Sequence, residues 1–383
     1  MWDTWQEEME HWSQQRWGQW FDEHEQQRVA ERERSRREAV ERRLRIEQRW
    51  TPSGDPERDA QQRSELYHQD RLEHPHSIRR EWEEQQALRR QEVLTYPTLP
   101  LRHHTDLQRP EGVPEQQDPR TVGFGPSGEA LALWGETSER ATHLSRYDCD
   151  GQLSASMPLE TVPWAFHVQP LPHGQVLVVE AGGPRAAVHD GVGRLVRTID
   201  VGRGVTRVLS TVEGQVWIGY DKESPRDHYF SQHGLVRFGA DLTPHWRYPL
   251  STALPDIYDC LVLNVDGEAA WTYSWTSFHL VGVHAGQAQD HGRVPVDHAR
   301  AVLVADDQAA TISGYGGEDD VLTPLRLATD SIWLAGSPAR LVLPGGADLP
   351  RARYTSRGPD LHAVIGTAWY RLSLDDVGSR WVI

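Results

Sequence analysis

The sequence predicts a mainly β repeat domain preceded by an α-helical arm. Residues 1–94 consist largely of Glu, Gln and Arg with hardly any glycine, a composition that favours helix. From about residue 119 onward, short apolar runs are separated by turns rich in Gly, Pro and Asp, a pattern typical of strands. One unit of this kind also recurs along the second part. A chain of 383 residues is long enough for one large β domain and an appendage.

The arm begins with apolar residues, mostly aromatic, at helical spacing, which would place one stripe on a helix. An apolar stripe needs a partner, which is another part of this chain, a protein partner or a second copy. Acidic residues on the opposite face argue against a membrane surface. We treat the stripe as a candidate docking or self-association surface, with packing inside the same chain as the alternative. Its members are Trp2, Trp5, Met9, Trp12, Trp17, Trp20 and Phe21.

An arginine-rich stretch follows between Arg28 and Arg49. Arginines bind phosphate, so a contact with nucleic acid is one interpretation. Pairs such as Glu33 with Arg37 instead indicate a solvated helix, because Glu and Arg four residues apart stabilise each other. The segment TPSGDP at 51–56 breaks this helix, which predicts a helical hairpin or a bent coiled coil. The net charge of −16 argues against general nucleic-acid binding.

Residues 95–118 contain four prolines and are predicted to form an extended linker between the arm and the β domain. The predicted organisation is therefore an arm over 1–94, a linker over 95–118 and a β domain over 119–383.

The β domain repeats one unit, which consists of a short run, a polar turn that usually contains glycine, and an apolar strand that often carries Trp. A second hairpin follows most copies. Four strands in roughly 40–50 residues is the size of one β-propeller blade. The copies are VGFGPSGEALALWG from Val122, FHVQPLPHGQVLVVEAG from Phe166, RVLSTVEGQVWIGY from Arg207, CLVLNVDGEAAWTYSW from Cys260, VLVADDQAATISGY from Val302 and YTSRGPDLHAVIGT from Tyr354.

These six copies resemble a six-bladed β-propeller of the broad NHL/lactonase-like kind found in bacteria. The resemblance covers about residues 119–383 and rests on the repeat, since the copies carry neither a WD dipeptide nor a kelch double glycine. It implies a ring that must be closed. The last copy offers four strands of its own, ending in RWVI, whereas Val93–Leu101 offers a closing strand from outside the repeat.

Several motifs of enzyme chemistry are missing from the sequence or are better explained as turns. Cys149 and Cys260 form no disulfide framework or zinc pattern, and Lys222 is the sole lysine. GFGPSG at 123–128 is followed by a strand pattern, whereas a dinucleotide site requires a helix there. YDCDG at 147–151 fits a hairpin turn better than a calcium loop. The sequence predicts no metal and no cofactor.

The location of the protein is predicted from two features. The N-terminus lacks the pattern of a signal peptide, and no apolar run reaches the roughly 20 residues that a membrane span requires. The low cysteine count is compatible with a reducing compartment. We therefore predict a cytoplasmic protein without a membrane span.

A binding rim can be nominated from the propeller resemblance. In a propeller, the starts of the innermost strands and the loops after the second strands lie at the same end, around the channel. The loop 221–234 is the longest of these and carries charged and aromatic residues, and the strand starts also bring Arg207. The predicted rim residues are Trp164, Glu180, Tyr220, Asp221, Tyr258, Asp259, Tyr273, Trp275, His298, Tyr315, Glu318 and Arg353.

The functional hypothesis is a non-catalytic scaffold in which the propeller face binds a partner or small molecule and the arm docks or oligomerises. The alternative is a metal-dependent hydrolase or lyase similar to lactonases, with a divalent metal such as Ca or Mg at the channel mouth. Metal ligands from several blades are scattered along a sequence, so the lack of a linear motif leaves catalysis open. The candidate ligands are Glu180, Asp221, Asp259, Asn264 and His298.

Overall fold

The computed structural model describes residues 85–135, 143–159, 165–180, 184–221, 230–275, 277–313, 316–350 and 352–378, together with residues 49, 50, 59, 62, 65 and 66. The chain divides into two compact units, Met1–Gln85 and Gln86–Ile383. The aromatic stripe of the predicted arm lies outside the described residues. None of the helices in the described part is long and apolar enough to cross a membrane.

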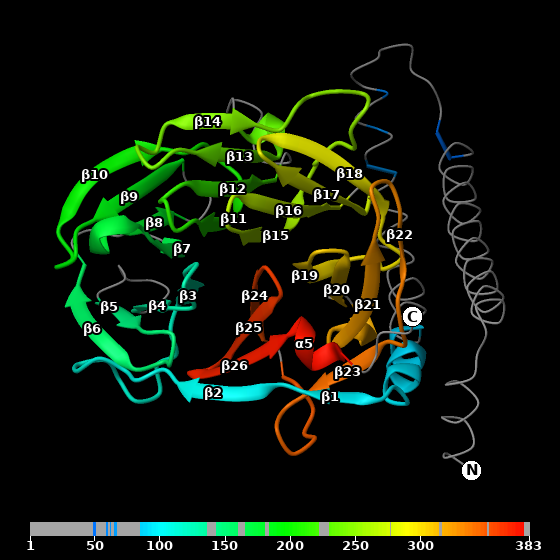
Figure 1. Ribbon diagram of the computed structural model, residues 1–383, viewed down its shortest axis with the longest axis horizontal. Helices are drawn as coiled ribbons and strands as arrows, with labels where there is room; N and C mark the ends of the chain where they lie inside the picture. Colours follow the sequence, from blue (N-terminus) through cyan, green and yellow to red (C-terminus); the bar gives the residue numbers. More distant parts are fainter. Residues whose placement is uncertain are drawn as a thin grey trace. The chain divides into compact units, whose positions relative to one another are not determined.

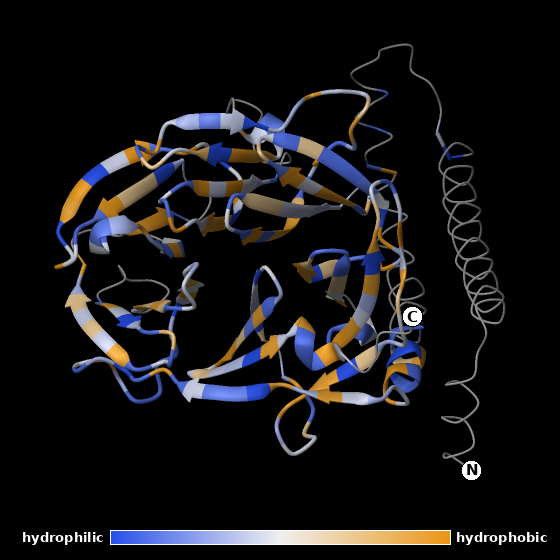
Figure 2. Cartoon of the chain, in the orientation of Figure 1, coloured by the Kyte–Doolittle hydropathy of each residue, from blue (hydrophilic) through white to orange (hydrophobic). Residues whose placement is uncertain are grey.

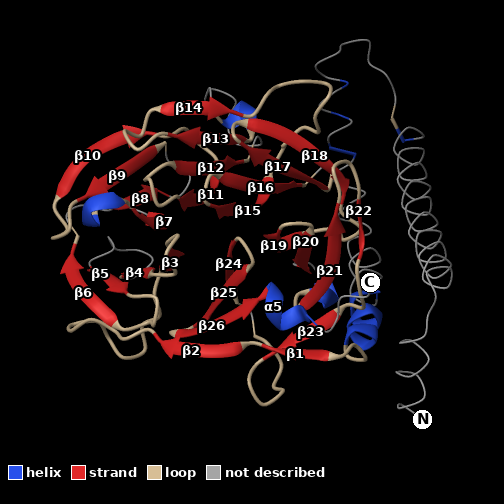
Figure 3. Ribbon diagram, in the orientation of Figure 1, coloured by secondary structure: helices blue, strands red, loops and turns tan. Residues whose placement is uncertain are grey.

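The second unit is built mainly from strands (Figure 3). Short apolar runs between turn residues favour strands. The side chains of a strand alternate between two faces, and each face can pack against a neighbouring sheet. Its described helices are residues 86–93, the short α5 (Leu374–Val377) and three single-turn 3₁₀ helices, η1 (Pro172–Gly174), η2 (Ser231–His233) and η3 (Gly316–Glu318).

Three of the sheets are antiparallel meanders of four strands, each formed by consecutive strands of the chain. The first contains β3 (Thr121–Phe124), β4 (Ala130–Trp134), β5 (His143–Tyr147) and β6 (Leu153–Pro158). The second contains β7 (Ala165–Pro170), β8 (Val176–Glu180), β9 (Arg185–His189) and β10 (Leu195–Asp200). The third contains β11 (Val205–Ser210), β12 (Val216–Tyr220), β13 (Leu235–Phe238) and β14 (Pro244–Arg247).

An eight-stranded sheet consists of two further groups of four, joined by the single parallel pair Asn264 and Ser356. One group contains β15 (Cys260–Asp266), β16 (Ala269–Ser274), β17 (His279–His284) and β18 (Gln287–Arg293). The other contains β24 (Arg353–Arg357), β25 (Asp360–Ile365), β26 (Ala368–Ser373) and β2 (Arg102–Asp106).

The remaining sheet has six strands. It contains β19 (Ala299–Ala305), β20 (Gln308–Ser313), β21 (Val321–Leu327), β22 (Ile332–Leu334), β23 (Ala339–Val342) and β1 (Thr98–Pro100). Figure 1 shows the sheets of this unit arranged around a common centre, with β3, β7, β11, β15, β19 and β24 innermost. The prediction of a mainly β, propeller-type domain is confirmed by this topology.

Two strands come from the proline-rich segment before the repeats. β1 pairs in parallel with β23, and β2 pairs antiparallel with β26 at the outer edge of the sheet. The buried side chains of Leu99, Leu101 and Leu107 attach this segment to the core. The segment RWVI, which the sequence offered as a last strand, lies outside the described residues.

Neighbouring sheets are held together by buried apolar clusters. Val168, Val176 and Val178 of one sheet pack with Leu131 and Leu133 of the sheet before it. The same arrangement recurs around the unit, and one cluster joins the first repeat to the last through Phe124, Trp134, Val364 and Trp369. The outer strands β14 and β18 are mostly hydrophilic (Figure 2). Burial of apolar faces between sheets is therefore the main stabilising contribution.

Helix 86–93 packs against the loop that carries η3. The Gly317 amide donates to Oε1 of Gln86 at 2.7 Å, and Arg90 forms an ion pair with the buried Asp320 at 2.5 Å. Val93 is completely buried. These contacts place the end of the predicted arm, from Gln86 onward, in the same compact unit as the sheets.

Candidate functional site

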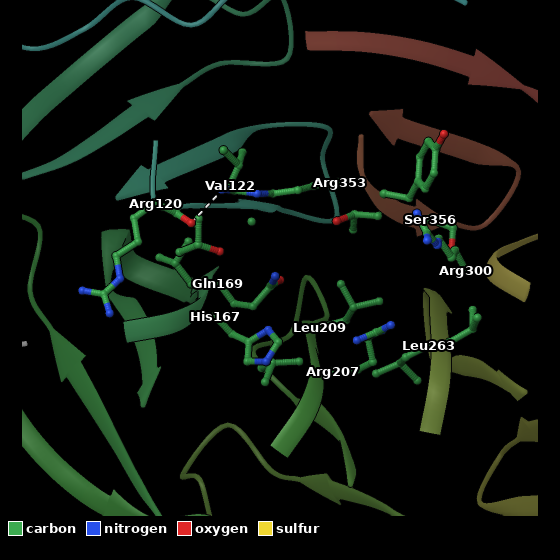
Figure 4. A pocket seen from close by; sticks show the side chains of 17 residues that line it. Arg120, Val122, His167, Gln169, Arg207, Leu209, Leu263, Arg300, Arg353 and Ser356 are labelled. Atoms are coloured by element: carbon green, nitrogen blue, oxygen red, sulfur yellow. Dashed lines mark hydrogen bonds between the residues drawn. The ribbon is translucent and has the colours of Figure 1, made fainter. Parts of the chain in front are cut away.

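The innermost strands enclose a cavity of about 440 Å³. β3, β7, β11, β15 and β24 each contribute lining residues, and β19 contributes Arg300. Figure 4 shows the lining residues, which come from strands far apart in the sequence, placed around one pocket. The volume lies in the range of small-molecule sites.

A β-bulge recurs at the start of the innermost strands. The pairing register shifts between Ala165 and His167 in β7 and between Val205 and Arg207 in β11, and β15 and β19 carry corresponding shifts. A bulge places one extra residue in a strand and redirects the neighbouring side chains. In β19 the extra residue is Arg300, and in β7 and β11 the bulge directly precedes the cavity-lining His167 and Arg207.

The cavity lining is cationic. Arg120, Arg207, Arg300 and Arg353 all belong to it, and no Asp or Glu is among the described residues that line the cavity. This contrasts with the chain as a whole, whose net charge is −16. The nearby carboxylate of Asp319 is 3.6 Å from Nη2 of Arg300 but is about half exposed, with 52% of its side chain accessible. An exposed pair of this kind is screened by water and offsets little of the charge.

Arg207 and Arg353 make their hydrogen bonds to backbone carbonyls within the described residues. Nη1 of Arg207 donates to the carbonyl of Thr206 at 2.7 Å. Nη1 of Arg353 donates to the carbonyls of Pro119 and Arg120, both at 2.8 Å. Burial lowers the pKa of both guanidinium groups. Acidic groups nearby act in the opposite direction, Cys260 and Asp259 on the pKa of Arg207 and Asp118 on that of Arg353, and offset the effect of burial only in part.

His167 stands beside Arg207 in the cavity wall. Burial, and secondarily the positive charge of Arg207, lower the pKa of His167 to about 3, although a hydrogen bond with the backbone of Val205 acts in the opposite direction. The imidazole is therefore neutral near pH 7. A neutral ring contributes hydrogen-bonding atoms to the cavity without adding charge.

Arg357 lies beneath the floor of the cavity, directly after the lining residue Ser356, and is buried with 7% of its surface accessible. Its Nε donates to the carbonyl of Phe124 at 2.8 Å, Nη1 to the carbonyl of Ser210 at 2.7 Å, and Nη2 to Oε1 of Gln169 at 2.8 Å. One side chain from β24 therefore connects β3, β7 and β11. Burial lowers the pKa of Arg357 to about 10, so the group stays charged at neutral pH.

Asn264, which follows the lining residue Leu263, lies outside the lining and links the strands on the opposite side. Its Nδ2 donates to the carbonyls of Val302 and Gly358 at 2.7 and 2.8 Å, and its Oδ1 accepts from the Gly358 amide at 2.6 Å. The sequence nominated Asn264 as a metal ligand. The structure instead uses both amide atoms to join β15 to β19 and to the turn after β24.

Two pairs of predicted rim residues meet. The rings of Trp275 and His298 are 4.5 Å apart between centroids, and Trp275 is 41% exposed. Asp221 and Asp259 form an isolated antiparallel bridge between the end of β12 and the start of β15. Arg353 lines the cavity itself.

Other predicted rim residues have structural contacts or lie elsewhere. Tyr220 and Tyr273 are buried, and their hydroxyls donate to the carbonyls of Val201 and Val296 at 2.5 and 2.6 Å. Glu318 accepts a hydrogen bond from Arg89 of the helix before β1. Glu180 and Tyr258 are half-buried. Trp164, Tyr315 and residues 222–229 of the long loop lie outside the described residues.

Most of the residues that line the cavity were not predicted from the sequence. Arg120, His167, Gln169 and Arg300 were not nominated, although all but Gln169 lie near the start of an innermost strand. One signal was available, because His167 and Arg207 occupy the same position relative to the turn glycine of their hairpins, Gly174 and Gly214. When the copies are aligned on these glycines, His167 and Arg207 fall at the same position of the repeat.

No protein-family model matches the chain, and no curated protein matches it in sequence. Solved structures with similar folds include Hsv2 of Kluyveromyces lactis, with 11% identity over 70% of this chain and 78% of that chain and a TM-score of 0.43. A gluconolactonase of Xanthomonas campestris matches with 12% identity over 72% and 98%, and a TM-score of 0.43. Virginiamycin B lyase of Staphylococcus aureus matches with 10% identity over 71% and 98%, and a TM-score of 0.41. At these values the likenesses carry no argument about function.

Proposed function

We propose that this chain is a non-catalytic recognition protein whose six-bladed propeller binds a ligand in its central cavity. The observation that carries the proposal is the cavity lining, which combines arginines with neutral polar and apolar side chains. Such a lining offers directional hydrogen bonds and charge for binding.

The count of six blades is supported by the pairing of the strands. Each innermost strand begins a group of about four, and β2 completes the group that contains β24, β25 and β26. The apolar cluster of Phe124 and Trp369 between the first and last repeats supports closure of the ring.

The non-catalytic part of the proposal is supported by the state of the reactive groups near the cavity. A general base works best with a pKa near the operating pH, and His167 has a pKa of about 3. Cys260 is buried, and burial raises the pKa of its thiol to about 11, so little nucleophilic thiolate is present at neutral pH. These pKa values fit groups in the wall of a binding cavity better than groups of a catalytic centre.

The alternative, a hydrolase or lyase that uses Ca or Mg, would place a cation near the arginines of the mouth. A divalent cation is repelled by such a lining, and Asn264, one of its candidate ligands, is used in backbone hydrogen bonds. Glu180, Asp221, Asp259 and His298 stay candidates for a metal outside the cavity.

The metal question is tested by thermal unfolding of the full chain with a panel of divalent ions, combined with bound-metal content measured by mass spectrometry. The expected result is no stoichiometric metal and no large shift of the unfolding temperature. One retained metal per chain with a shift that grows with metal concentration would overturn the non-catalytic proposal, because a ligand of the native state stabilises it by mass action.

The proposed role of the arm is to dock a protein partner or a second copy through its aromatic stripe, in a cytoplasmic protein without general nucleic-acid binding. The test compares the molar mass in solution of the full chain with that of residues 85–383, a cut that retains helix 86–93 and the buried Val93. The full chain with Trp5→Glu and Trp12→Glu is the matched variant. Self-association that both changes abolish supports the stripe, and association that survives both contradicts it.

A further inference from the structure

We infer that the central cavity binds a small organic anion with two or more carboxylate or phosphate groups, held by Arg207 and Arg353 at its mouth. This inference rests on the proposed function, since it names the ligand class of the same cavity. It is carried by the charge, the hydrogen bonding and the shape of the lining.

Positive charge is concentrated in the lining of the cavity. Four arginines line one cavity of about 440 Å³, without a carboxylate among the described lining residues, in a chain of net charge −16. Like charges enclosed by protein repel one another more strongly than in water. An anion between them removes that repulsion, so the enclosed site selects negative charge. The buried Arg357 beneath the floor adds to the same potential.

Arg207 and Arg353 also have the hydrogen-bonding capacity to bind an anion. A guanidinium carries five N–H groups in a planar fork that matches a carboxylate or a phosphate. Arg207 donates to one carbonyl, and Arg353 donates to two carbonyls through the same Nη1 atom. Neither forms an ion pair among the described residues. Arg357 differs, because all three of its guanidinium nitrogens donate to protein acceptors.

The lining also contains apolar residues between the arginines and the floor. Between the arginines and the floor, the wall consists of apolar side chains such as Val208, Leu209 and Leu263, and the polar Gln169 and Ser356 lie toward the floor. Inorganic phosphate alone would leave this apolar surface uncovered. A carbon skeleton with charged groups at separate positions matches both the arginines and the wall, so the ligand class is a multiply charged organic anion.

Calorimetric titration of the full chain with citrate tests this inference, at low ionic strength in a buffer without multivalent anions. Trimethyl citrate, which has the same skeleton without charge, and inorganic phosphate are the comparison probes. Citrate is expected to bind at one site, more tightly than phosphate, and to weaken as sodium chloride is added. Trimethyl citrate is expected not to bind.

Arg207→Gln and Arg353→Gln are each expected to weaken citrate binding by about tenfold or more, since a charge-assisted hydrogen bond is lost. Arg197→Gln is the matched control, because it makes the same charge change on the exposed outer strand β10 and should leave affinity unchanged. Circular dichroism verifies that each variant is folded. Arg353 lies at the exposed mouth, so its variant keeps the test decisive if Arg207→Gln fails to fold.

Citrate binding that is equal in all three variants would overturn the inference, since the anion would then bind elsewhere. Binding of neutral fragments in the cavity, detected by ligand-observed NMR, without binding of citrate or phosphate would overturn the anion inference and leave the proposed function standing. Failure of charged and neutral probes alike would overturn both.

Discussion

The mouth and the floor of the central cavity both depend on arginine, but they use it differently. At the floor, Arg357 is buried and donates three hydrogen bonds that connect neighbouring innermost strands. At the mouth, Arg207 and Arg353 donate to one and two backbone carbonyls and face the cavity. The same side chain is a structural link where its donors are used by the protein, and a ligand-binding group where they are not.

The strongest test of this contrast is Arg357→Gln. The change leaves the carbonyls of Phe124 and Ser210 without their donor, so we expect the free energy of unfolding to fall by about 3 kcal/mol. Urea unfolding followed by tryptophan fluorescence measures the loss.

Two arginine variants serve as controls for that measurement. Arg197→Gln, on the exposed β10, should stay within about 0.5 kcal/mol of the parent. Arg207→Gln should cost less than Arg357→Gln, because Arg207 donates one hydrogen bond among the described residues whereas Arg357 donates three. Equal losses for Arg357→Gln and Arg207→Gln would contradict the distinction between floor and mouth.

The second test removes Asn264, the second polar side chain that links the innermost strands beneath the cavity. Asn264→Ala leaves the Val302 carbonyl without this donor and the Gly358 amide without this acceptor, whereas the Gly358 carbonyl keeps its bond from the Val304 amide. We expect a loss of about 2 kcal/mol in unfolding free energy. The affinity for citrate should change little, since Asn264 does not line the cavity. A stable variant with abolished citrate binding would instead show that Asn264 belongs to the ligand site.

The third test uses pH and the mouth residue His167. Its pKa is about 3 in the folded chain, whereas an unfolded histidine has a pKa of about 6.5. Between these values the unfolded state binds more protons, so stability falls as the pH is lowered below about 6.5 and is fully retained above it. The slope contributed by His167 is at most about 1.4 kcal/mol per pH unit.

The expected result is a shallower fall in stability for His167→Gln than for the parent when urea unfolding is compared between pH 5 and pH 8. His173→Gln, at an exposed position in η1, is the control and should follow the parent. Parallel curves for His167→Gln and the parent would contradict the burial of a neutral imidazole.

The repeat is visible in the sequence because turn chemistry is local. Gly128, Gly174, Gly214 and Gly267 all adopt positive φ, between 52° and 83°, in the turns between the first and second strands of their groups. Glycine is the residue that adopts this conformation without a steric penalty, so its recurrence along the chain marks the positions of the hairpins.

The cavity could not be predicted in the same way because it depends on contacts between distant repeats. Arg357 precedes Gly358 and Pro359, a sequence typical of an exposed turn, yet it is buried by β3, β7 and β11. Its environment arises only when the ring is assembled. The sequence offered a closing strand over Val93–Leu101, whereas the strand that pairs with β26 is β2, which begins directly after that range. Local patterns do not fix which residues pair between distant segments.

The smallest expected effect concerns Asp319, a carboxylate that pairs with Arg300 of the cavity lining. Its Oδ1 is 3.6 Å from Nη2 of Arg300, and 52% of its side chain is exposed. Asp319→Asn removes a screened negative charge, so citrate affinity should rise by about twofold at low salt and by less at physiological salt. Asp307→Asn is the matched control, since Asp307 pairs with Arg326 at 2.7 Å outside the cavity lining. If both variants changed affinity equally, the effect would come from net charge alone, whereas a change confined to Asp319→Asn assigns it to the potential at the mouth.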